Sequence, residues 1–148
     1  MRRLWCVGVI LLLGFGFMAE RADAQNRSGG RERGSRLEQN YPNPFNPTTT
    51  IPFMLFEEDF PGGRPATVTI RIFNILRQPV ATPVAKDHPS GGAPLVERLE
   101  YPPEKVGLNE AYWDGLDRDG RKVSSGLYLI QLEINGVRQG TKSMTVSK

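Results

Sequence analysis

Hydrophobic and polar residues alternate with a period of two in several short stretches of this chain. The clearest is residues 127–134, where every second residue from Tyr128 onward is large and apolar. Because a period of two is typical of a β-strand, this stretch is predicted to be the central strand of a sandwich. Its other face is apolar at Leu127 and polar at Glu133, which predicts that both faces are covered near Leu127.

Four further stretches are predicted to be strands: residues 49–56, 66–73, 107–113 and 137–147. In the first of these, Pro52 lacks a backbone N–H, so this strand is predicted to lie at the edge of a sheet. In the second, Val68, Ile70 and Ile72 are predicted to point inward, and Thr67, Thr69 and Arg71 outward. The last strand alternates weakly, and only Met144 and Val146 can point inward.

Turn signals separate these stretches. The dipeptides Asp114-Gly115, Asp119-Gly120 and Asn135-Gly136 suit backbone positions with positive φ, and the third predicts a type I′ hairpin. Residues 79–103 are less regular and predict two short strands around a Pro/Gly-rich turn. About seven short strands therefore predict an all-β fold, an antiparallel Ig-like β-sandwich with Trp113 and Tyr128 buried in one core.

The first 24 residues have the pattern of a signal peptide. Two arginines precede an uncharged apolar run at residues 4–18, and Ala22 and Ala24 form an A-x-A site, so cleavage is predicted after Ala24. The run is shorter than the ~20 apolar residues that span a bilayer, so no membrane span is expected after cleavage. The protein is therefore expected to be exported through the inner membrane.

Residues 25–36 are rich in Gly, Ser and Arg and contain no apolar side chain, so they predict a disordered linker before one domain at residues 37–148. Residues 1–24 carry a net charge of +1 and residues 25–36 one of +3, which leaves −1 on the domain when the whole chain carries +3. A nearly neutral domain argues against a nucleic-acid face. The single cysteine, Cys6, leaves with the signal peptide, so no disulfide is expected.

Candidate catalytic residues are few. His88 is the one histidine in the sequence, lies in a Pro/Gly turn and is expected to be exposed, without a partner for nucleophilic catalysis. Ser124 and Ser125 lack a G-x-S-x-G elbow, and neither a phosphate-binding loop nor a zinc-ligand spacing occurs. The sequence therefore predicts a non-enzymatic protein without a cofactor.

Three carboxylates, Asp114, Asp117 and Asp119, lie within six residues and raise the possibility of a calcium site. In an EF-type loop containing Asp117 and Asp119 at positions 3 and 5, the ligands at positions 1 and 12 would be missing. These residues are better interpreted as turn residues that hydrogen-bond their own backbone, although other calcium-binding loop geometries stay open.

Four motifs together resemble a known family: YPNPFNP at residues 41–47, WDG at residues 113–115, SGLY at residues 125–128 and GTKSMTVSK at residues 140–148. In this order and spacing the chain resembles the Ig-like domain of flagellar hook-capping (FlgD-type) proteins and the C-terminal sorting domain (type A) of the type IX secretion system. The first and last motifs fit the sorting domain better. At the position where the family usually has Gly, this chain has Arg77, so the sequence does not establish that the turn has the family's usual geometry.

The resemblance implies recognition by the outer-membrane secretion machinery, with passage through the periplasm to the cell surface or the exterior. It places a domain-entry motif on Tyr41, Pro42, Asn43, Pro44 and Phe45, and a sorting signal on Gly126, Tyr128, Lys142, Val146 and Lys148. Tyr41 and Phe45 are the apolar side chains available to pin the entry motif. In this interpretation the machinery engages the edge of the last strand by strand addition.

Two questions stay open at this point. Sorting domains normally follow a large cargo, whereas only residues 25–36 precede this one, so the domain is either itself the exported product or a remnant of a longer gene. The alternative function is an Ig-like structural, adhesive or hook-capping-type binding module, with residues 79–103 as its contact surface.

Overall fold

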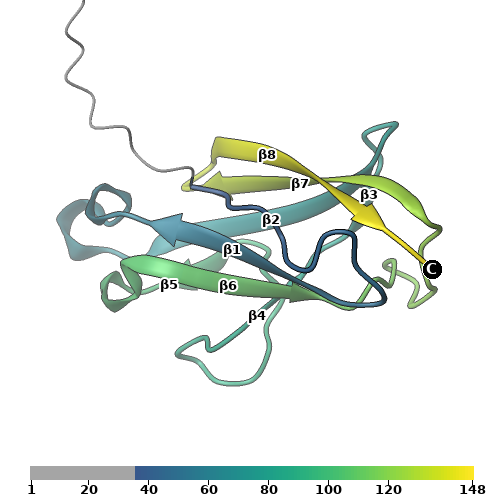
Figure 1. The fold of residues 1–148 in the computed structure, drawn as a ribbon. Helices are drawn as coiled ribbons and strands as arrows, with labels where there is room; N and C mark the ends of the chain where they lie inside the picture. Colours follow the sequence, from purple (N-terminus) through teal and green to yellow (C-terminus); the bar gives the residue numbers. More distant parts are fainter. Residues whose placement is uncertain (1–35) are drawn as a thin grey trace, which may run out of the picture. The chain divides into compact units, whose positions relative to one another are not determined.

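The alternating stretches of the sequence form two antiparallel sheets that face each other as a sandwich (Figure 1). The computed structural model describes residues 36–148; the predicted signal peptide with Ala22 and Ala24, and residues 25–35, lie outside the described residues. The strands are β1 (Thr49–Leu55), β2 (Ala66–Asn74), β3 (Pro79–Ala81), β4 (Val84–Ala85), β5 (Leu99–Tyr101), β6 (Gly107–Trp113), β7 (Gly126–Ile134) and β8 (Val137–Val146). The predicted all-β antiparallel sandwich is confirmed, with eight strands in the described part of the chain.

The order of the strands agrees with two predictions made from single residues. One sheet has the order β1-β6-β4, and the other has the order β3-β2-β7-β8, with β5 also paired to β2. The strand β7 lies between β2 and β8, so the predicted central strand is confirmed. The strand β1 lies at the edge of its sheet, as Pro52 predicted. The carbonyl of Pro52 accepts a 3.0 Å hydrogen bond from the N–H of Glu38 on the side away from β6, so its missing N–H removes no bond to β6.

The core lies between the facing sheets and consists of the inward residues of the alternating strands. The side chains of Val68, Ile70 and Ile72 on β2 are fully buried, as predicted, and so is Met144 on β8. Burying one such side chain contributes about 1.5–3 kcal/mol to folding. The core therefore follows directly from the alternation of the sequence.

Two predictions about outward faces are wrong. Leu127 is 49% exposed, because its side of β7 is the outer face of the sheet and the facing sheet covers only the inner one. Thr69 is only 3% exposed, because the segment before β5 lies over it: the N–H of Arg98 donates to Thr69 Oγ1 at 2.9 Å. Periodicity gives the face of a residue but not whether a loop covers that face.

Residues 79–103 contain three short strands, β3, β4 and β5, rather than the predicted two. His88, predicted to be exposed, is 8% exposed. Its Nδ1 lies 2.7 Å from Ser90 Oγ, its Nε2 lies 2.9 Å from the carbonyl oxygen of Glu100, and its ring packs edge-on against Tyr101 at 4.9 Å. These contacts show that His88 ties the loop to β5.

The buried phenol of Tyr101 leads to a testable prediction. Tyr101 is 1% exposed, and its hydroxyl has no hydrogen-bond partner within residues 36–148. Because a buried hydroxyl without a partner costs about 1–3 kcal/mol, Tyr101→Phe is expected to raise the free energy of unfolding at neutral pH by about 1–2 kcal/mol. Urea denaturation measures this change, and a loss of stability would show that the hydroxyl is bonded.

The same substitution should alter the response to high pH. Burial raises the pKa of the Tyr101 phenol above its ordinary value of 10.0. Above that pH the unfolded chain ionises before the folded one, so the stability of the wild type should fall as the pH rises toward the folded-state pKa. The fall should be shallower in Tyr101→Phe, and identical slopes in the two proteins would contradict this account. Burial also raises the pKa of Tyr128, so some decline should remain.

Two turns show how well local signals predict the backbone. Asn135 and Gly136 have φ of 50° and 78°, which agrees with the predicted type I′ hairpin between β7 and β8. Arg77, which stands where the family usually has Gly, also has a positive φ, 59°. The backbone at Arg77 therefore adopts a left-handed conformation that favours glycine.

Candidate functional site

The segment before β1, here called the strap (residues 36–47), joins the edges of the two sheets (Figure 1). Its first half lies along β1: the N–H of Tyr41 donates to the carbonyl of Thr50 at 2.9 Å, and the N–H of Thr50 donates back at 2.8 Å. Its second half lies along β8: the N–H of Phe45 donates to the carbonyl of Thr145 at 3.0 Å, and that of Ser147 donates to the carbonyl of Phe45 at 2.9 Å. The strap therefore closes one side of the sandwich.

Arg36, the last residue of the predicted linker, is already part of this structure. Its guanidinium forms ion pairs with Glu58 and with Asp59, which is 6% exposed, and lies 4.7 Å from the centre of the Phe56 ring. Its carbonyl accepts a 2.7 Å hydrogen bond from the N–H of Met54 at the end of β1. The strap is thus fastened at its first described residue.

The entry motif and the WDG and SGLY motifs meet in one aromatic cluster. Phe45 is 1% exposed, and its ring centre lies 5.4 Å from that of Trp113, which in turn lies 5.9 Å from that of Tyr128. The indole N–H of Trp113 donates to the carbonyl of Leu116 at 2.9 Å, and the hydroxyl of Tyr128 donates to the carbonyl of Ser124 at 3.0 Å. The prediction that Trp113 and Tyr128 share one core is confirmed.

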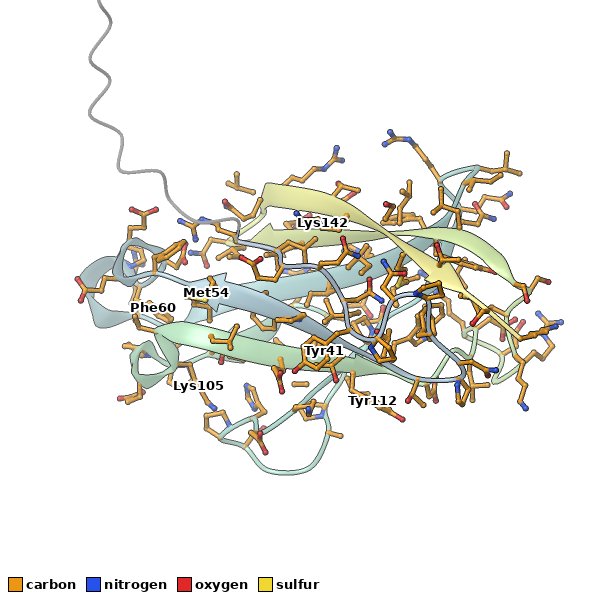
Figure 2. All side chains as sticks on the ribbon, viewed as in Figure 1. Tyr41, Met54, Phe60, Lys105, Tyr112 and Lys142 are labelled. Carbon is orange, nitrogen blue, oxygen red and sulfur yellow. The ribbon has the colours of Figure 1, made fainter. Side chains whose placement is uncertain are left out.

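Tyr41 does not pin the strap as expected, because it is 51% exposed. Its hydroxyl donates to the carboxylate of Glu110 on the outer side of β6, near Tyr112 (Figure 2). This hydrogen bond raises the pKa of Tyr41 and, together with the ammonium of Lys86, lowers the pKa of Glu110. Of the two aromatic residues of the motif, only Phe45 enters the core.

Sequence reasoning missed the polar contacts that hold the strap. Asn40 is 2% exposed and donates to Thr49 Oγ1 at 2.9 Å. Gln39 donates to the carbonyl of Ser143 at 2.9 Å, and Asn43 Oδ1 accepts the N–H of Thr145 at 2.9 Å. Prolines leave the strap few backbone donors, so amide side chains supply the contacts. The Asn and Gln residues beside the prolines were the signal in the sequence that could have indicated these contacts.

Gly115 explains why WDG and the entry motif occur together. It has φ of +76°, and a Cβ at this position would lie 2.5 Å from the carbonyl oxygen of Pro47. Side chains other than hydrogen are therefore excluded by both the backbone conformation and the neighbouring strap. The turn after Trp113 therefore lies directly against Pro47 of the strap.

The residues of the predicted sorting signal lie on β7 and β8, but they are not all together. Gly126 pairs with Val146, and Tyr128 pairs with Met144, beside the aromatic cluster. Lys148 follows at the C-terminus, where it and Val146 line a shallow cavity of about 270 Å³ with Pro47 of the strap. Lys142, labelled in Figure 2, pairs with Ile130 further along β8. At the usual rise per residue of a strand it lies about 20 Å from Lys148.

Two of the three carboxylates of the acidic turn after Trp113 hydrogen-bond its backbone, as the turn interpretation predicted, whereas that of Asp119 pairs with the guanidinium of Arg121. Asp114 Oδ1 accepts the N–H of Leu116 at 3.0 Å, and Asp117 Oδ1 accepts those of Asp119 and Arg121 at 2.9 Å each. The N–H of Arg121 is the main cause that lowers the pKa of Asp117. Within residues 36–148 no three His, Cys, Asp or Glu side chains are grouped to hold a metal ion.

Comparisons with known proteins add a fold likeness. No protein-family model matches the sequence, and no curated protein matches it. Among solved structures, dimeric latent PorU from Porphyromonas gingivalis matches with a TM-score of 0.53 and 18% identity over 74% of this chain. The match covers 9% of that chain, so this protein shares the fold of a small part of PorU. Residues 36–148 contain no helix that is long and apolar enough to cross a membrane.

Proposed function

We propose that this chain is an exported, non-enzymatic sorting domain whose C-terminal strand is read by the outer-membrane machinery of type IX secretion. The observation that carries the proposal is the convergence of its four motifs. The strap reaches the C-terminal strand: the carbonyl oxygen of Phe45 accepts hydrogen bonds from the N–H and the hydroxyl of Ser147, which is 102 positions away. The same strap packs on Trp113 and Gly115. Motifs that only resemble a sorting domain in sequence thus form one contiguous structure.

The fold likeness supports the same proposal. The similarity to a part of PorU is compatible with a β-sandwich related to type IX secretion. The partner is then the outer-membrane secretion machinery, and the route leads through the periplasm to the cell surface or the exterior. Export requires the signal peptide that ends at Ala24.

The strap changes the expected mode of recognition. Strand addition needs free backbone groups at the edge of β8. From Ser143 to Ser147 the backbone groups of that edge already form hydrogen bonds with Gln39, Asn43 and Phe45. The address is therefore proposed to be the surface beside this edge, where Lys142 and Lys148 carry positive charge, and not an open edge at the C-terminus.

The test fuses residues 36–148 behind a signal peptide and a folded reporter, in a host that has the type IX machinery. The double variant Lys142→Glu/Lys148→Glu should lower the amount of reporter at the surface by about tenfold or more, since like-charge contacts suppress recognition. Arg138→Glu, an exposed charge reversal at the other end of β8, should leave display unchanged. Truncation at Ser143 is unsuitable, because it removes Met144 and Val146 from the core.

Two results would overturn the proposal. The wild-type fusion would remain in the periplasm, or the double variant would fold and reach the surface as well as the wild type. Circular dichroism and denaturation of each purified variant establish that the charge reversals leave the sandwich folded.

A second candidate function, an Ig-like structural, adhesive or hook-capping-type binding module, is favoured by one observation. The irregular segment between β3 and β5 and the acidic turn enclose a groove of about 500 Å³. This volume is within the range of about 300–1,000 Å³ that is typical of binding pockets. A domain that displays no reporter but binds a partner through this groove would be such a module.

A further inference from the structure

The groove between the β3–β5 segment and the acidic turn has an apolar interior and an acidic rim. Its apolar lining comes from Val84, Leu95, Tyr112 and Leu116. Leu95 is 55% exposed, so part of the apolar lining is open to solvent. Glu97 and Asp114 stand at the groove as exposed carboxylates, and neither forms an ion pair within residues 36–148. Together with Asp117 they outnumber Arg118, the positively charged residue of the lining.

The turn between β2 and β3, here called the tip (residues 75–77), has the complementary character. This turn joins β2 to β3 (Figure 1). Its residues Ile75 and Leu76 are 67% and 73% exposed, and Arg77 follows them. Asn74 holds the turn in shape: its Oδ1 accepts the N–H groups of Leu76 and Gln78 at 3.0 Å each, and its carbonyl accepts that of Arg77 at 2.9 Å. The tip therefore presents two aliphatic side chains and one positive charge in a preorganised conformation.

We propose that the tip of one molecule binds in the groove of a second copy of this chain. The two aliphatic side chains of the tip match the apolar lining, and Arg77 matches the exposed carboxylates of Glu97 and Asp114. Both surfaces are exposed within one molecule, so a second molecule is needed to bury them. The contact joins two different surfaces, so it is a heterologous, head-to-tail interface.

The size of the tip sets the expected strength. Three residues in one groove bury less than the ~1,200 Å² that separates stable complexes from transient ones, so the dissociation constant should be about 10⁻⁴ M. The interface thus operates where molecules are crowded, and it leaves dilute protein monomeric.

The first test is a concentration series of the purified protein, followed by two-dimensional amide NMR and sedimentation up to about 1 mM, well above that constant. Signals from the tip and from the groove should shift together as the concentration rises. Leu76→Asp and Glu97→Lys should each weaken self-association by about tenfold or more, because each places a charge against an apolar or basic partner. Both positions are exposed, so the fold should be retained.

The second test mixes the two variants. Leu76→Asp has a defective tip and an intact groove, whereas Glu97→Lys has an intact tip and a defective groove. An equimolar mixture should regain association through the one intact pair and form dimers only. An interface between two identical surfaces cannot be restored in this way.

Val137→Asp is the matched control, since Val137 is an aliphatic residue of similar exposure, 60%, in the β7–β8 hairpin. This variant should associate like the wild type. The proposal is overturned if the wild type stays monomeric throughout the series, or if Leu76→Asp associates as strongly as the wild type. It is also overturned if Val137→Asp abolishes association or the mixture shows none.

Discussion

Replacing Trp113 with alanine is expected to lower the free energy of unfolding by about 3–5 kcal/mol, the range for removal of a buried aromatic ring. Trp113 is 2% exposed and lies between Phe45 of the strap and Tyr128 of β7. Its loss opens a cavity at the point where the strap and both sheets meet. Denaturation in urea, followed by circular dichroism, measures the change.

Trp113→Phe is the control for this experiment. It keeps a ring in the cluster but removes the N–H that donates to the carbonyl of Leu116, so the cost should be only about 1–2 kcal/mol. A denaturation midpoint that hardly moves in Trp113→Ala would mean that the indole is exposed in solution. In that case the convergence of the motifs would lose its central contact.

Gly115→Ala is expected to lower the free energy of unfolding by about 2–4 kcal/mol, because two penalties combine. The backbone at φ +76° costs an alanine about 1 kcal/mol, and the overlap of its Cβ with the carbonyl oxygen of Pro47 at 2.5 Å adds about 1–3 kcal/mol. That oxygen belongs to the backbone of the strap, which is bonded to β8 through Phe45, so it cannot move alone.

Gly120→Ala separates the two penalties, because Gly120 has the same φ of +76° but no atom within 4 Å of the added Cβ. It should cost only about 1 kcal/mol. Amide hydrogen exchange adds a local readout, since the N–H of Ser147 should exchange faster in Gly115→Ala as the strap loosens. An equal loss in the free energy of unfolding for Gly115→Ala and Gly120→Ala would mean that the strap does not lie against Gly115.

Much of the fold could be predicted from the sequence because it depends on near neighbours. The alternation along β2 and β7 determines which side chains are buried, and Pro52 determines an edge strand. The Asn-Gly turn and the carboxylate turns are likewise determined by residues within a few positions of each other. Periodicity and turn chemistry are local properties, so a sequence displays them directly.

The candidate site could be predicted only in part. The resemblance singled out the entry motif within the strap, Gly126, Tyr128 and Val146, and the structure brings these together. The amide contacts of Gln39 and Asn43 were missed, because nothing in a proline-rich segment tells which strand edge it meets. Tyr41 was expected to help pin the segment through its apolar ring, whereas its hydroxyl donates to the carboxylate of Glu110 on the surface.

The sequence by itself therefore determined the long strands, the turns between them and the inward faces of this protein. The tertiary structure alone decided that His88 is buried, that Thr69 is covered and that the strap lies against both Gly115 and the edge of β8. The reason is physical: each of these features depends on a contact between segments that are far apart in the chain. Such contacts depend on how the two sheets pack and where the loops cross them, and no local pattern of residues encodes that arrangement.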